Sequence, residues 1–409
     1  MTIPVSGPIS TSLINVELGE TPTTLISLGQ PTARALAAVL TGTISMSDFY
    51  GKSLLADGRT LWAWGYNHQG ELGDGTISDK SSPIQIGTLT NWSSIDCGGR
   101  HSLACKSDGT LWSWGYNNYG QLGDGTISSK LSPMQIGTLA IWVDVCGGRY
   151  HSLACKSDGT LWAWGRNDNG QLGDGTITNK SSPVQIGSLT NWAAVSGGYY
   201  HSLARKTDGT LWAWGRNDNG QLGDGTITNK SSPVQIGSLT DWVDVSGGIS
   251  HTIARKTNGT IWSWGINGNG QLGDGTATSR SSPVQIGTLT NWANVACGQQ
   301  HSLACKMDGT IWTWGQNDYG QLGSGTTISR SSPVQIGSLT NWVDVAGGQY
   351  YSIARKTDGT IWSWGRNDVG QLGDGTKTHR SSPVQIGSLT NWVAVASGRY
   401  YSLALQDPS

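Results

Sequence analysis

The chain alternates hydrophobic and polar residues in short runs that are separated by turn sequences. Residues 101–105 alternate with a period of two, the turn sequence of residues 106–109 follows, and residues 111–114 alternate again. Asp-Gly between two alternating runs is a strong hairpin signal, because glycine supplies the backbone conformation that a tight turn needs. After a polar, glycine-rich loop come two more runs, which open with Pro133 and Trp142. We therefore predict four short antiparallel strands, without a helix, in this unit.

The unit recurs seven times with a period of 50 residues. The sequence Leu/Ile-Trp-x-Trp-Gly begins at residues 61, 111, 161, 211, 261, 311 and 361, and a further Trp follows 30 residues after the first Trp of each copy. These three positions account for all 21 tryptophans of the 409-residue chain. Four strands in each of seven repeats predict an all-β fold, a seven-bladed β-propeller with four-stranded blades.

The ends of the repeat array predict how the ring closes. The last alternating run, residues 401–405, has no Trp-x-Trp run after it, and the first Trp-x-Trp run has only the weak partner 53–55 before it. Pairing of the N- and C-terminal strands in one shared blade would remove the free edges of the array. We therefore predict a propeller domain over residues 53–409 and a separate segment over residues 1–52.

Composition and charge exclude several classes of function. Charged residues are 13% of the chain, against about 25% in an average protein, and the formal net charge of −1 gives no basic surface for nucleic acid. No apolar run approaches the roughly 18 residues that cross a bilayer, and the first residues lack the features of a signal peptide. We expect neither nucleic-acid binding nor membrane insertion, and synthesis in the cytoplasm.

The repeat resembles a known family. Trp-x-Trp-Gly-x-Asn-x-x-Gly-Gln-Leu-Gly, followed by Pro-x-x-Ile and Gly-x-x-His-Ser-Leu-Ala, is similar to the RCC1 repeat over about 350 residues of the chain. The resemblance implies a seven-bladed propeller. The founding RCC1 protein is a chromatin-bound guanine-nucleotide exchange factor that uses an inserted wedge and a basic N-terminal tail. Here the Trp spacing leaves no room for a wedge, and Arg34 and Lys52 are the only basic residues of the first 52, so the exchange activity does not follow from the fold.

Residues 1–52 contain no Trp and stand outside the repeat. Residues 31–40 read as a short helix, with Pro31 at its start and Gly42 after its end. Residues 44–52, Ile-Ser-Met-Ser-Asp-Phe-Tyr-Gly-Lys, resemble a segment at the start of many bacteriophage and prophage structural proteins. That resemblance implies an attachment segment that binds other virion proteins; an extension that only packs on the propeller is the alternative. The expected attachment residues are Ile9, Ile26, Ile44, Phe49 and Tyr50.

The chain offers no convincing catalytic group. Five histidines recur at one repeat position, where the last two copies have tyrosine: His101, His151, His201, His251, His301, Tyr351 and Tyr401. A residue that occurs once in each blade is explained more simply as a structural residue at a strand start than as five active sites. His68 and His379 are isolated. We expect no catalytic residue, no enzymatic activity and no cofactor.

Two further patterns have structural and chemical interpretations. Asp168, Asp174, Asp218 and Asp224 lie in loops that faintly resemble calcium sites, but the ligand alternation and closing Glu of an EF-hand are missing, so we interpret them as turn residues and expect no metal. The six cysteines form three pairs that we expect to flank a connection between blades: Cys97 with Cys105, Cys146 with Cys155, and Cys297 with Cys305. Their spacings match no zinc pattern. A disulfide in each pair remains open, although a cytoplasmic protein favours free thiols.

Two windows vary while the sequence around them is constant. The first comprises positions 66, 68 and 69 and their equivalents, and the second comprises the two residues before each His or Tyr position. They follow the second and fourth runs of the unit, so we predict that both emerge on one face of the ring, with the uniform turns on the other. Their Tyr and Arg side chains give large contact area with polar tips; neutral drift in exposed loops is the alternative. The predicted partner-binding residues are Tyr66, Tyr116, Tyr119, Tyr150, Tyr199, Tyr200, Tyr319, Tyr350, Arg366, Arg399 and Tyr400.

These patterns together favour a bacteriophage virion protein of the tail, a fibre, the baseplate or another surface appendage, present in several copies, with a homo-oligomer as one arrangement. Its propeller would bind a host-surface glycan, a host protein or a neighbouring virion protein. A purely structural staple of the virion and a cellular regulator of the exchange-factor type are the alternatives. The sequence names neither the receptor nor the symmetry.

Overall fold

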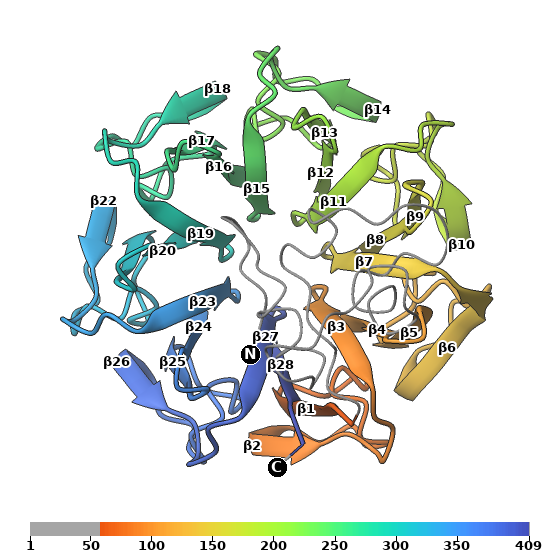
Figure 1. Ribbon diagram of the computed structural model, residues 1–409, viewed down its shortest axis with the longest axis horizontal. Coiled ribbons are helices and arrows are strands. Elements are labelled where there is room, and N and C mark those ends of the chain that lie inside the picture. The colour runs from red at the N-terminus through yellow and green to blue at the C-terminus, as the bar shows by residue number, and fades with distance from the viewer. Residues whose placement is uncertain (1–57, 409) are drawn as a thin grey trace, which may run out of the picture. The chain divides into compact units, whose positions relative to one another are not determined.

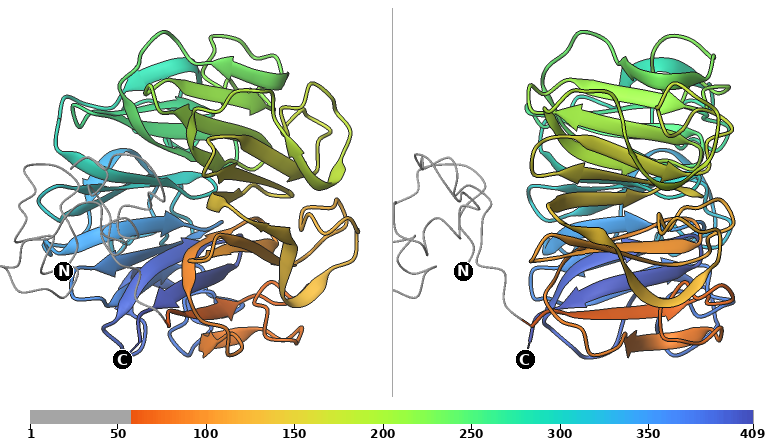
Figure 2. Two further views of the ribbon diagram at one scale, coloured as in Figure 1. Left: turned by 45° about the vertical axis from the view of Figure 1, so that its right-hand side comes forward. Right: turned by 90° about the vertical axis from the view of Figure 1, so that its right-hand side faces the viewer.

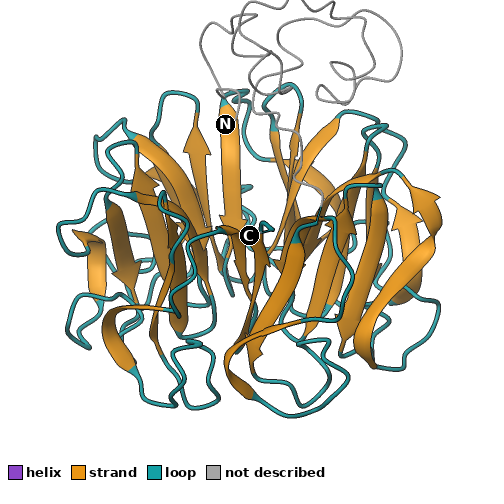
Figure 3. Ribbon diagram, turned by 60° about the horizontal axis from the view of Figure 1, so that its bottom comes forward, coloured by secondary structure: helices purple, strands orange, loops and turns teal. Residues whose placement is uncertain are grey.

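Seven four-stranded antiparallel sheets are arranged in a closed ring around a central axis (Figure 1). The computed structural model describes residues 58–408. Seen edge-on, the strands run from one face of the ring to the other (Figure 2), and loops cover both faces (Figure 3). The described residues contain strands and turns without a helix, and so no helix that could span a membrane. The predicted all-β, seven-bladed propeller is therefore confirmed.

Each of the first six blades consists of four consecutive strands, ordered from the axis outward. The first blade contains β3 (Trp92–Cys97), β4 (His101–Lys106), β5 (Thr110–Gly115) and β6 (Lys130–Ala140), and the second contains β7 (Trp142–Gly147), β8 (His151–Lys156), β9 (Leu161–Gly165) and β10 (Lys180–Gln185). The third contains β11 (Trp192–Gly197), β12 (His201–Lys206), β13 (Leu211–Gly215) and β14 (Lys230–Gln235), and the fourth contains β15 (Trp242–Gly247), β16 (His251–Lys256), β17 (Ile261–Gly265) and β18 (Arg280–Gln285). The fifth contains β19 (Trp292–Cys297), β20 (His301–Lys306), β21 (Ile311–Gly315) and β22 (Arg330–Gln335), and the sixth contains β23 (Trp342–Gly347), β24 (Tyr351–Lys356), β25 (Ile361–Gly365) and β26 (Arg380–Gln385).

The seventh blade joins the two ends of the propeller. It contains β27 (Trp392–Ser397), β28 (Tyr401–Gln406), β1 (Thr60–Gly65) and β2 (Lys80–Gln85). Strands β1 and β28 pair without interruption from Thr60 opposite Gln406 to Gly65 opposite Tyr401. The predicted closure between the N- and C-terminal strands is thus confirmed, and we call this sheet the closing blade.

The grouping of strands into blades differs from the grouping in the sequence unit. The run that opens with Trp142 was read as the fourth strand of its unit, but it forms β7, the innermost strand of the next blade. The physical reason is hydrogen bonding, because β7 pairs with β8 of the next blade, whereas β6 pairs with β5. A blade therefore begins at the third Trp of each repeat.

The Trp-x-Trp-Gly sequence builds the contacts between blades. The second Trp of each copy is fully buried, and the indole of Trp114 donates a hydrogen bond across the blade boundary to the carbonyl oxygen of Glu71 at 3.0 Å. The glycine that follows is obligatory. At Gly115 φ is +99°, and an added Cβ would lie 2.8 Å from the carbonyl oxygen of Arg100. These contacts repeat around the ring, and they explain why the motif is constant.

The segment of residues 1–52, the short helix at 31–40 and the weak strand at 53–55 lie outside the described residues. The expected attachment residues Ile9, Ile26, Ile44, Phe49 and Tyr50 lie there too, so these predictions stay predictions. The compact unit that contains the propeller begins at Gly58.

Candidate binding face

Both variable windows lie on the same face of the ring, as predicted. The first window follows the third strand of a blade and the second follows its first strand, and these strands run in the same direction. A backbone hydrogen bond joins the windows directly, from Tyr116 N–H to the Arg100 carbonyl oxygen at 2.9 Å. On the other face, Trp142 N–H donates to the Gly109 carbonyl oxygen at 3.0 Å and ties the uniform turns together. We call these the variable face and the uniform face.

Arg149 is the centre of a cluster of aromatic rings on the variable face. Its guanidinium carbon lies 4.8 Å from the ring centre of Tyr150, 4.6 Å from that of Tyr199 and 5.3 Å from that of Tyr200. Arg149 also donates a hydrogen bond to the hydroxyl of Tyr200. Burial raises the pKa of the Tyr199 hydroxyl, and Arg399 and Arg149 oppose that rise. Three tyrosines are therefore held by one planar cation.

The cluster continues from Tyr150 to the loop that follows β5 of the first blade. Tyr150 packs against Tyr116 and Tyr119, with ring centres 5.7 and 5.1 Å apart. The guanidinium of Arg166 covers Tyr119 at 5.0 Å and Tyr200 at 5.4 Å. The variable windows of neighbouring blades therefore form one connected surface.

A second cluster surrounds Arg366 and contains residues of the fifth, sixth and closing blades. Its guanidinium carbon lies 5.2 Å from the ring centre of Tyr319, 5.7 Å from that of Tyr350 and 5.1 Å from that of Tyr400. The ring of Tyr400 lies 6.3 Å from that of Tyr66. The guanidinium carbon of Arg399 also lies 4.9 Å from the ring centre of Tyr400.

The two clusters join into an arc. The guanidinium of Arg100 lies 5.5 Å from the ring centre of Tyr66, and the Arg100 backbone accepts the hydrogen bond from Tyr116. We call this connected set the Tyr/Arg crescent. Its members are Tyr66, Arg100, Tyr116, Tyr119, Arg149, Tyr150, Arg166, Tyr199, Tyr200, Arg216, Tyr319, Tyr350, Arg366, Arg399 and Tyr400, which include every predicted partner-binding residue.

The arc has a gap at the fourth blade and most of the fifth. The equivalent positions there are Ile249, Ser250, Ile266, Gln299, Gln300 and Gln316. In this gap the Asn269 amide donates to Gln300 Oε1 at 2.8 Å. The variable face is therefore asymmetric, although the backbone beneath it repeats seven times.

Ion pairs neutralise several of the crescent arginines. Arg166, Arg216 and Arg366 each pair with the aspartate two residues later, at N–O distances of 2.5, 2.5 and 2.6 Å. Burial alone would raise the pKa of the Asp168 carboxyl, but the hydrogen bond and charge of Arg166 outweigh it and lower that pKa. The ion pairs therefore fix the orientation of these three guanidinium groups, and the aspartates offset their positive charge.

A cavity of about 290 Å³ opens along the axis of the ring. The inner strands line it, and Arg149, Tyr199, Gln299, Gln349 and Arg399 surround its mouth on the variable face. Burial raises the pKa of the Asp144 carboxyl on β7 to about 6, opposed by a hydrogen bond that Asp144 accepts from Val195 N–H at 3.1 Å. Three crescent residues, Arg149, Tyr199 and Arg399, therefore lie at the mouth of this cavity.

The repeated histidines connect adjacent blades. His101 Nε2 lies 2.8 Å from Ser152 Oγ, and that hydroxyl already donates to the Gln121 carbonyl oxygen at 2.8 Å. His101 must therefore donate from Nε2, so its Nδ1 carries no proton. His151, His201, His251 and His301 make the same contact with the next blade, and the Tyr351 and Tyr401 hydroxyls contact Ser402 and Ser102. These seven side chains, which we call the His/Tyr ring, occupy strand starts, as predicted.

Burial keeps the histidines of this ring neutral. All five are fully buried. Burial lowers the pKa of His101, His151, His201 and His301 to about 3 and that of His251 to about 4. His68 and His379 stand outside this ring and contact Tyr66 and Tyr319, with ring centres 4.4 and 5.3 Å apart.

The cysteine pairs correct one expectation from the sequence. They flank a hairpin within a blade and not a connection between blades, because Cys97 ends β3 and Cys105 lies on β4. Cys97 pairs with Ser102 and Cys105 with Ser94, so the two thiols occupy opposite ends of the hairpin. Two sulfur atoms at opposite ends of a hairpin are too far apart to form a disulfide. All six cysteines are free thiols.

The aspartates that faintly resembled calcium ligands organise the loops. Asp174 Oδ1 accepts hydrogen bonds from Asn167 Nδ2 and Thr176 N–H, both at 3.0 Å, and its other oxygen pairs with Lys180 at 3.5 Å. Asp224 makes the equivalent contacts with Asn217, Thr226 and Lys230, while Asp168 and Asp218 pair with arginines. Within residues 58–408, no group of three or more His, Cys, Asp or Glu side chains could hold a metal ion.

Two features escaped the sequence analysis. Glu71 is fully buried at a position where the other six repeats have Gln, and burial raises the pKa of its carboxyl to about 7. A lysine at the end of the second strand stacks on two tryptophans in six blades, and Gln406 replaces it in the closing blade. The sequence could have shown both features, because at each of these two positions six repeats share one residue and the seventh repeat has another.

The closed ring of four-stranded sheets defines the class of this protein, a seven-bladed β-propeller. A family model described as RCC1-like domain matches residues 31–295, and a model of the regulator of chromosome condensation (RCC1) repeat matches residues 308–355 and 358–405. A second model of the same repeat matches residues 292–321 and 342–371. The chain therefore belongs to the RCC1-like family. No curated protein matches it.

Solved structures of the same fold agree with this assignment. Human WBSCR16 is 22% identical with a TM-score of 0.77, over 86% of this chain and 99% of that protein. Yeast RCC1 (Prp20), solved bound to Kap60, is 22% identical with a TM-score of 0.78, over 86% of this chain and 90% of that one. Prp20p from Saccharomyces cerevisiae, whose structure was described with its binding to Gsp1p and histones, is 23% identical with a TM-score of 0.78, over 87% and 93%. At this identity the likeness establishes the fold.

Proposed function

We propose that this protein is a non-enzymatic binding protein of a bacteriophage virion, and that its Tyr/Arg crescent contacts the partner. The partner is a host-surface glycan or protein, or a neighbouring virion protein. The observation that carries the binding role is the connected arc of tyrosines and arginines on one face. Tyr and Arg are enriched at the energetic centres of interfaces, because they give large, stiff contact area with polar tips.

The chemistry of the crescent fits recognition of a polar partner. Its rings are partly buried against one another, so little side-chain entropy remains to be lost on binding. Three of its arginines, Arg166, Arg216 and Arg366, pair with aspartates, which fixes the orientation of their guanidinium groups. One such face binds weakly, and several copies on one particle would add avidity.

The virion setting is supported by the resemblance of residues 44–52 to the segment that precedes unrelated modules in phage structural proteins. In this setting Ile9, Ile26, Ile44, Phe49 and Tyr50 anchor the protein, which assembles in the host cytoplasm. The test is removal of residues 1–52, followed by immunodetection on purified particles. We expect the shortened protein to stay folded and to be absent from particles. Its presence at wild-type level would contradict the attachment role.

A structural staple of the virion is the second candidate, because copies of a protein attached to one particle also meet neighbouring virion proteins. Soluble propeller added to host cells separates the two roles. Blocked adsorption supports receptor binding. Particles that lose stability without the protein, but adsorb normally while intact, support the staple.

An exchange factor for a small GTPase is the third candidate, and it rests on the fold shared with Prp20. Two observations weigh against it. The seven repeats keep the 50-residue spacing without an inserted wedge, and Arg34 and Lys52 are the only basic residues of the first 52. A nucleotide-release assay with the host's small GTPases tests this role, and acceleration above the intrinsic rate would overturn the virion proposal.

A further inference from the structure

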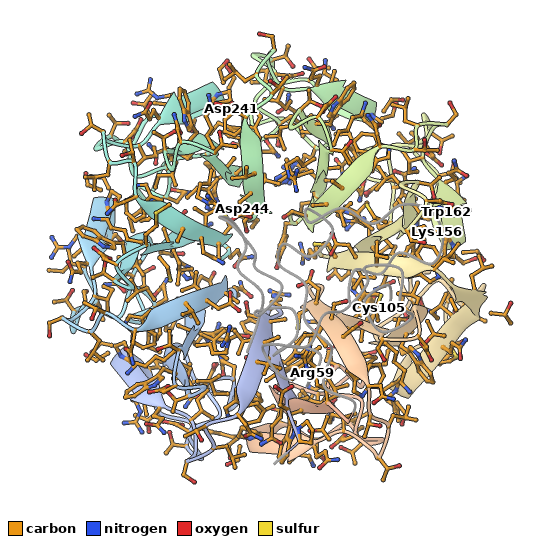
Figure 4. All side chains as sticks on the ribbon, in the orientation of Figure 1. Arg59, Cys105, Lys156, Trp162, Asp241 and Asp244 are labelled. Carbon is orange, nitrogen blue, oxygen red and sulfur yellow. The ribbon has the colours of Figure 1, made fainter. Side chains whose placement is uncertain are left out.

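The innermost strands of the seven blades line the cavity of about 290 Å³ on the axis of the ring. Seen down the axis, Asp244 on β15 lies near the centre of the ring, whereas Trp162 on β9 lies towards its rim (Figure 4). One position of the innermost strand changes its chemistry around the ring. The residues there, in blade order, are Asp96, Cys146, Ser196, Ser246, Ala296, Ala346 and Ala396. The wall is therefore polar in the first four blades and consists of alanines at this position in the other three.

The polar side chains at this position accept hydrogen bonds from backbone N–H groups of the next blade. Asp96 Oδ2 accepts one from Gly147 N–H at 2.8 Å. Ser246 Oγ accepts the equivalent bond from Cys297 N–H at 2.9 Å. Alanine has no acceptor atom, so three N–H groups of the cavity wall lack this side-chain contact. These N–H groups belong to Gly347, Ser397 and Cys97. The alanine side of the cavity therefore has three neighbouring donors for a ligand.

Two arginines add positive charge at the mouth of the cavity. Arg149 and Arg399 occupy the same position of their repeats, where the fifth and sixth blades have Gln299 and Gln349. Within residues 58–408 neither arginine forms an ion pair, whereas Arg166 of the crescent pairs with an aspartate. Arg399 Nε donates to Gln349 Oε1 at 2.5 Å, which positions its guanidinium group. Both positive charges are therefore available to an anion.

Three polar atoms at the mouth are buried without a hydrogen-bond partner among the described residues. They are Arg149 Nε, the Tyr199 hydroxyl and Gln299 Oε1. Burial raises the pKa of the Tyr199 hydroxyl, so the hydroxyl keeps its proton and can donate. The charges of Arg399 and Arg149 oppose that rise, so both guanidinium groups lie near this hydroxyl. The mouth therefore combines charged and neutral donors with one amide acceptor.

Charge and volume together select the class of ligand. Of the residues that line the cavity, Arg149 and Arg399 are positive and Asp96 is negative, so the lining has a formal net charge of +1. One carboxylate balances this charge, whereas a dianion would exceed it and would face Asp96. The volume of about 290 Å³ is also much larger than the roughly 15 Å³ that a single water needs. The remaining N–H donors and the Gln299 acceptor suit hydroxyl groups, which both accept and donate.

We propose that the axial cavity binds a hexuronic acid, a sugar that carries one carboxylate and several hydroxyl groups. The carboxylate contacts Arg149 and Arg399 at the mouth, and the hydroxyl groups contact the N–H groups of the alanine side and Gln299. This inference rests on the proposed function and deepens it, because it names the acidic sugar through which the crescent contacts a host-surface glycan. Arg149, Tyr199 and Arg399 belong to both the crescent and the mouth of the cavity.

The probe for this site is methyl glucuronide, titrated into the full-length protein and followed by saturation-transfer NMR on the probe. We expect saturable binding with a dissociation constant of about 1 mM, as a few charge-assisted hydrogen bonds give. Methyl glucoside, which lacks only the carboxylate, should bind at least tenfold more weakly. Sulfate at the same concentration should not displace the glucuronide. Absence of saturable glucuronide binding, equal binding of the two sugars, or displacement by sulfate would overturn the proposal.

Arg399→Gln tests the charged mouth with little risk of misfolding, because glutamine stands at the equivalent position in two other blades. We expect this variant to bind methyl glucuronide at least tenfold more weakly and methyl glucoside as the wild type does. Arg330→Gln is the matched control, since it removes an exposed arginine at the start of β22, which does not line the cavity. Unchanged glucuronide binding in Arg399→Gln, or an equal loss in Arg330→Gln, would contradict the site.

Ala346→Asp tests the alanine side of the cavity. It places at Ser397 N–H the acceptor and the negative charge that Asp96 places at Gly147 N–H. We expect at least tenfold weaker binding of methyl glucuronide. Ala346→Ser adds a neutral acceptor like Ser246 and should weaken binding several-fold, and it decides the outcome if the aspartate variant unfolds. Wild-type affinity in a folded variant of either kind would overturn the placement of the sugar.

Binding of the probe and adsorption to host cells separate this inference from the proposed function. Soluble protein that blocks adsorption through the crescent but does not bind methyl glucuronide would overturn the sugar-acid site and leave the receptor role standing. Protein that binds the glucuronide through Arg399 but does not block adsorption would uphold the site and overturn the receptor role.

Discussion

At the residue scale, the buried titratable groups decide how the stability of the propeller depends on pH. The histidines of the His/Tyr ring have folded-state pKa values of about 3 to 4 because of burial, below the 6.5 of a free histidine. The unfolded chain therefore binds more protons below pH 6.5, and stability is lost as the pH falls from there towards 3. Glu71 acts in the opposite direction, because its folded pKa of about 7 lies above the ordinary 4.5.

His201→Tyr tests the histidine contribution, since tyrosine stands at the same position in two other blades. Each buried histidine makes the free energy of unfolding fall by up to about 1.4 kcal/mol for each pH unit below 6.5. We expect the free energy of unfolding of the variant, relative to that of the wild type, to rise by up to this amount for each unit that the pH falls between pH 6 and pH 4. Urea unfolding at both values measures it, and parallel pH profiles would contradict the account.

Glu71→Gln tests the second group and restores the residue of the other six repeats. The folded-state carboxyl resists ionisation, so the wild type loses stability as the pH rises from about 4.5 to about 7. We expect the variant to gain up to about 3 kcal/mol of unfolding free energy at pH 8 and almost nothing at pH 4. A gain of the same size at both pH values would show that packing, and not ionisation, is responsible.

At the element scale, the connection between the first and second strands of a blade requires a glycine, because a neighbouring side chain occupies the space that a Cβ atom would need. An added Cβ at Gly198 would lie 2.1 Å from His201 Cε1, which is buried and held by Thr252. At Gly187, where φ is +64°, an added Cβ would have no neighbour within 4 Å.

We expect Gly198→Ala to lower the free energy of unfolding by several kcal/mol through steric overlap in the core. Gly187→Ala, the matched control, should cost only about 1 kcal/mol from its positive φ. Thermal unfolding of the two variants measures the difference. Similar unfolding temperatures would contradict the packing of the His/Tyr ring.

The repeat made most of the fold predictable, and the exceptions have physical reasons. Strand positions, the number of blades and the closure between β1 and β28 follow from residue periodicity. Residue periodicity does not predict that Trp142 belongs to the next blade. Hydrogen bonding, and not order along the chain, defines a sheet, and a strict repeat does not show at which residue one blade ends and the next begins. The placement of both windows on one face was predictable from strand direction. The connection of the windows into one arc, through contacts such as that of Arg100 with Tyr66, became visible only in the structure.

At the scale of the whole molecule, the closing blade holds the ring together without a covalent link. Six residue pairs connect β1 to β28, and Tyr401 contacts Ser102 of the next blade. Without this blade the array would expose two unpaired edges.

A chain that ends at residue 400 lacks β28 and tests this closure. We expect it to lose cooperative unfolding and to aggregate, because the edges of β1 and β27 become free. A chain that ends at residue 406 retains β28, and it should unfold close to the wild-type temperature. Cooperative wild-type unfolding of the shorter chain would show that the ring does not depend on this pairing.

The central claim is that the Tyr/Arg crescent is the surface that binds a partner, and competition for adsorption to host cells tests it most directly. Soluble full-length protein should block particle adsorption, and the triple variant Tyr150→Ala, Arg166→Ala, Tyr200→Ala should block at least tenfold less. The matched control alters the gap of the same face, Asn269→Ala, Gln300→Ala, Gln316→Ala, and should compete like the wild type. Equal competition by the crescent variant, the gap variant and the wild type would contradict the claim.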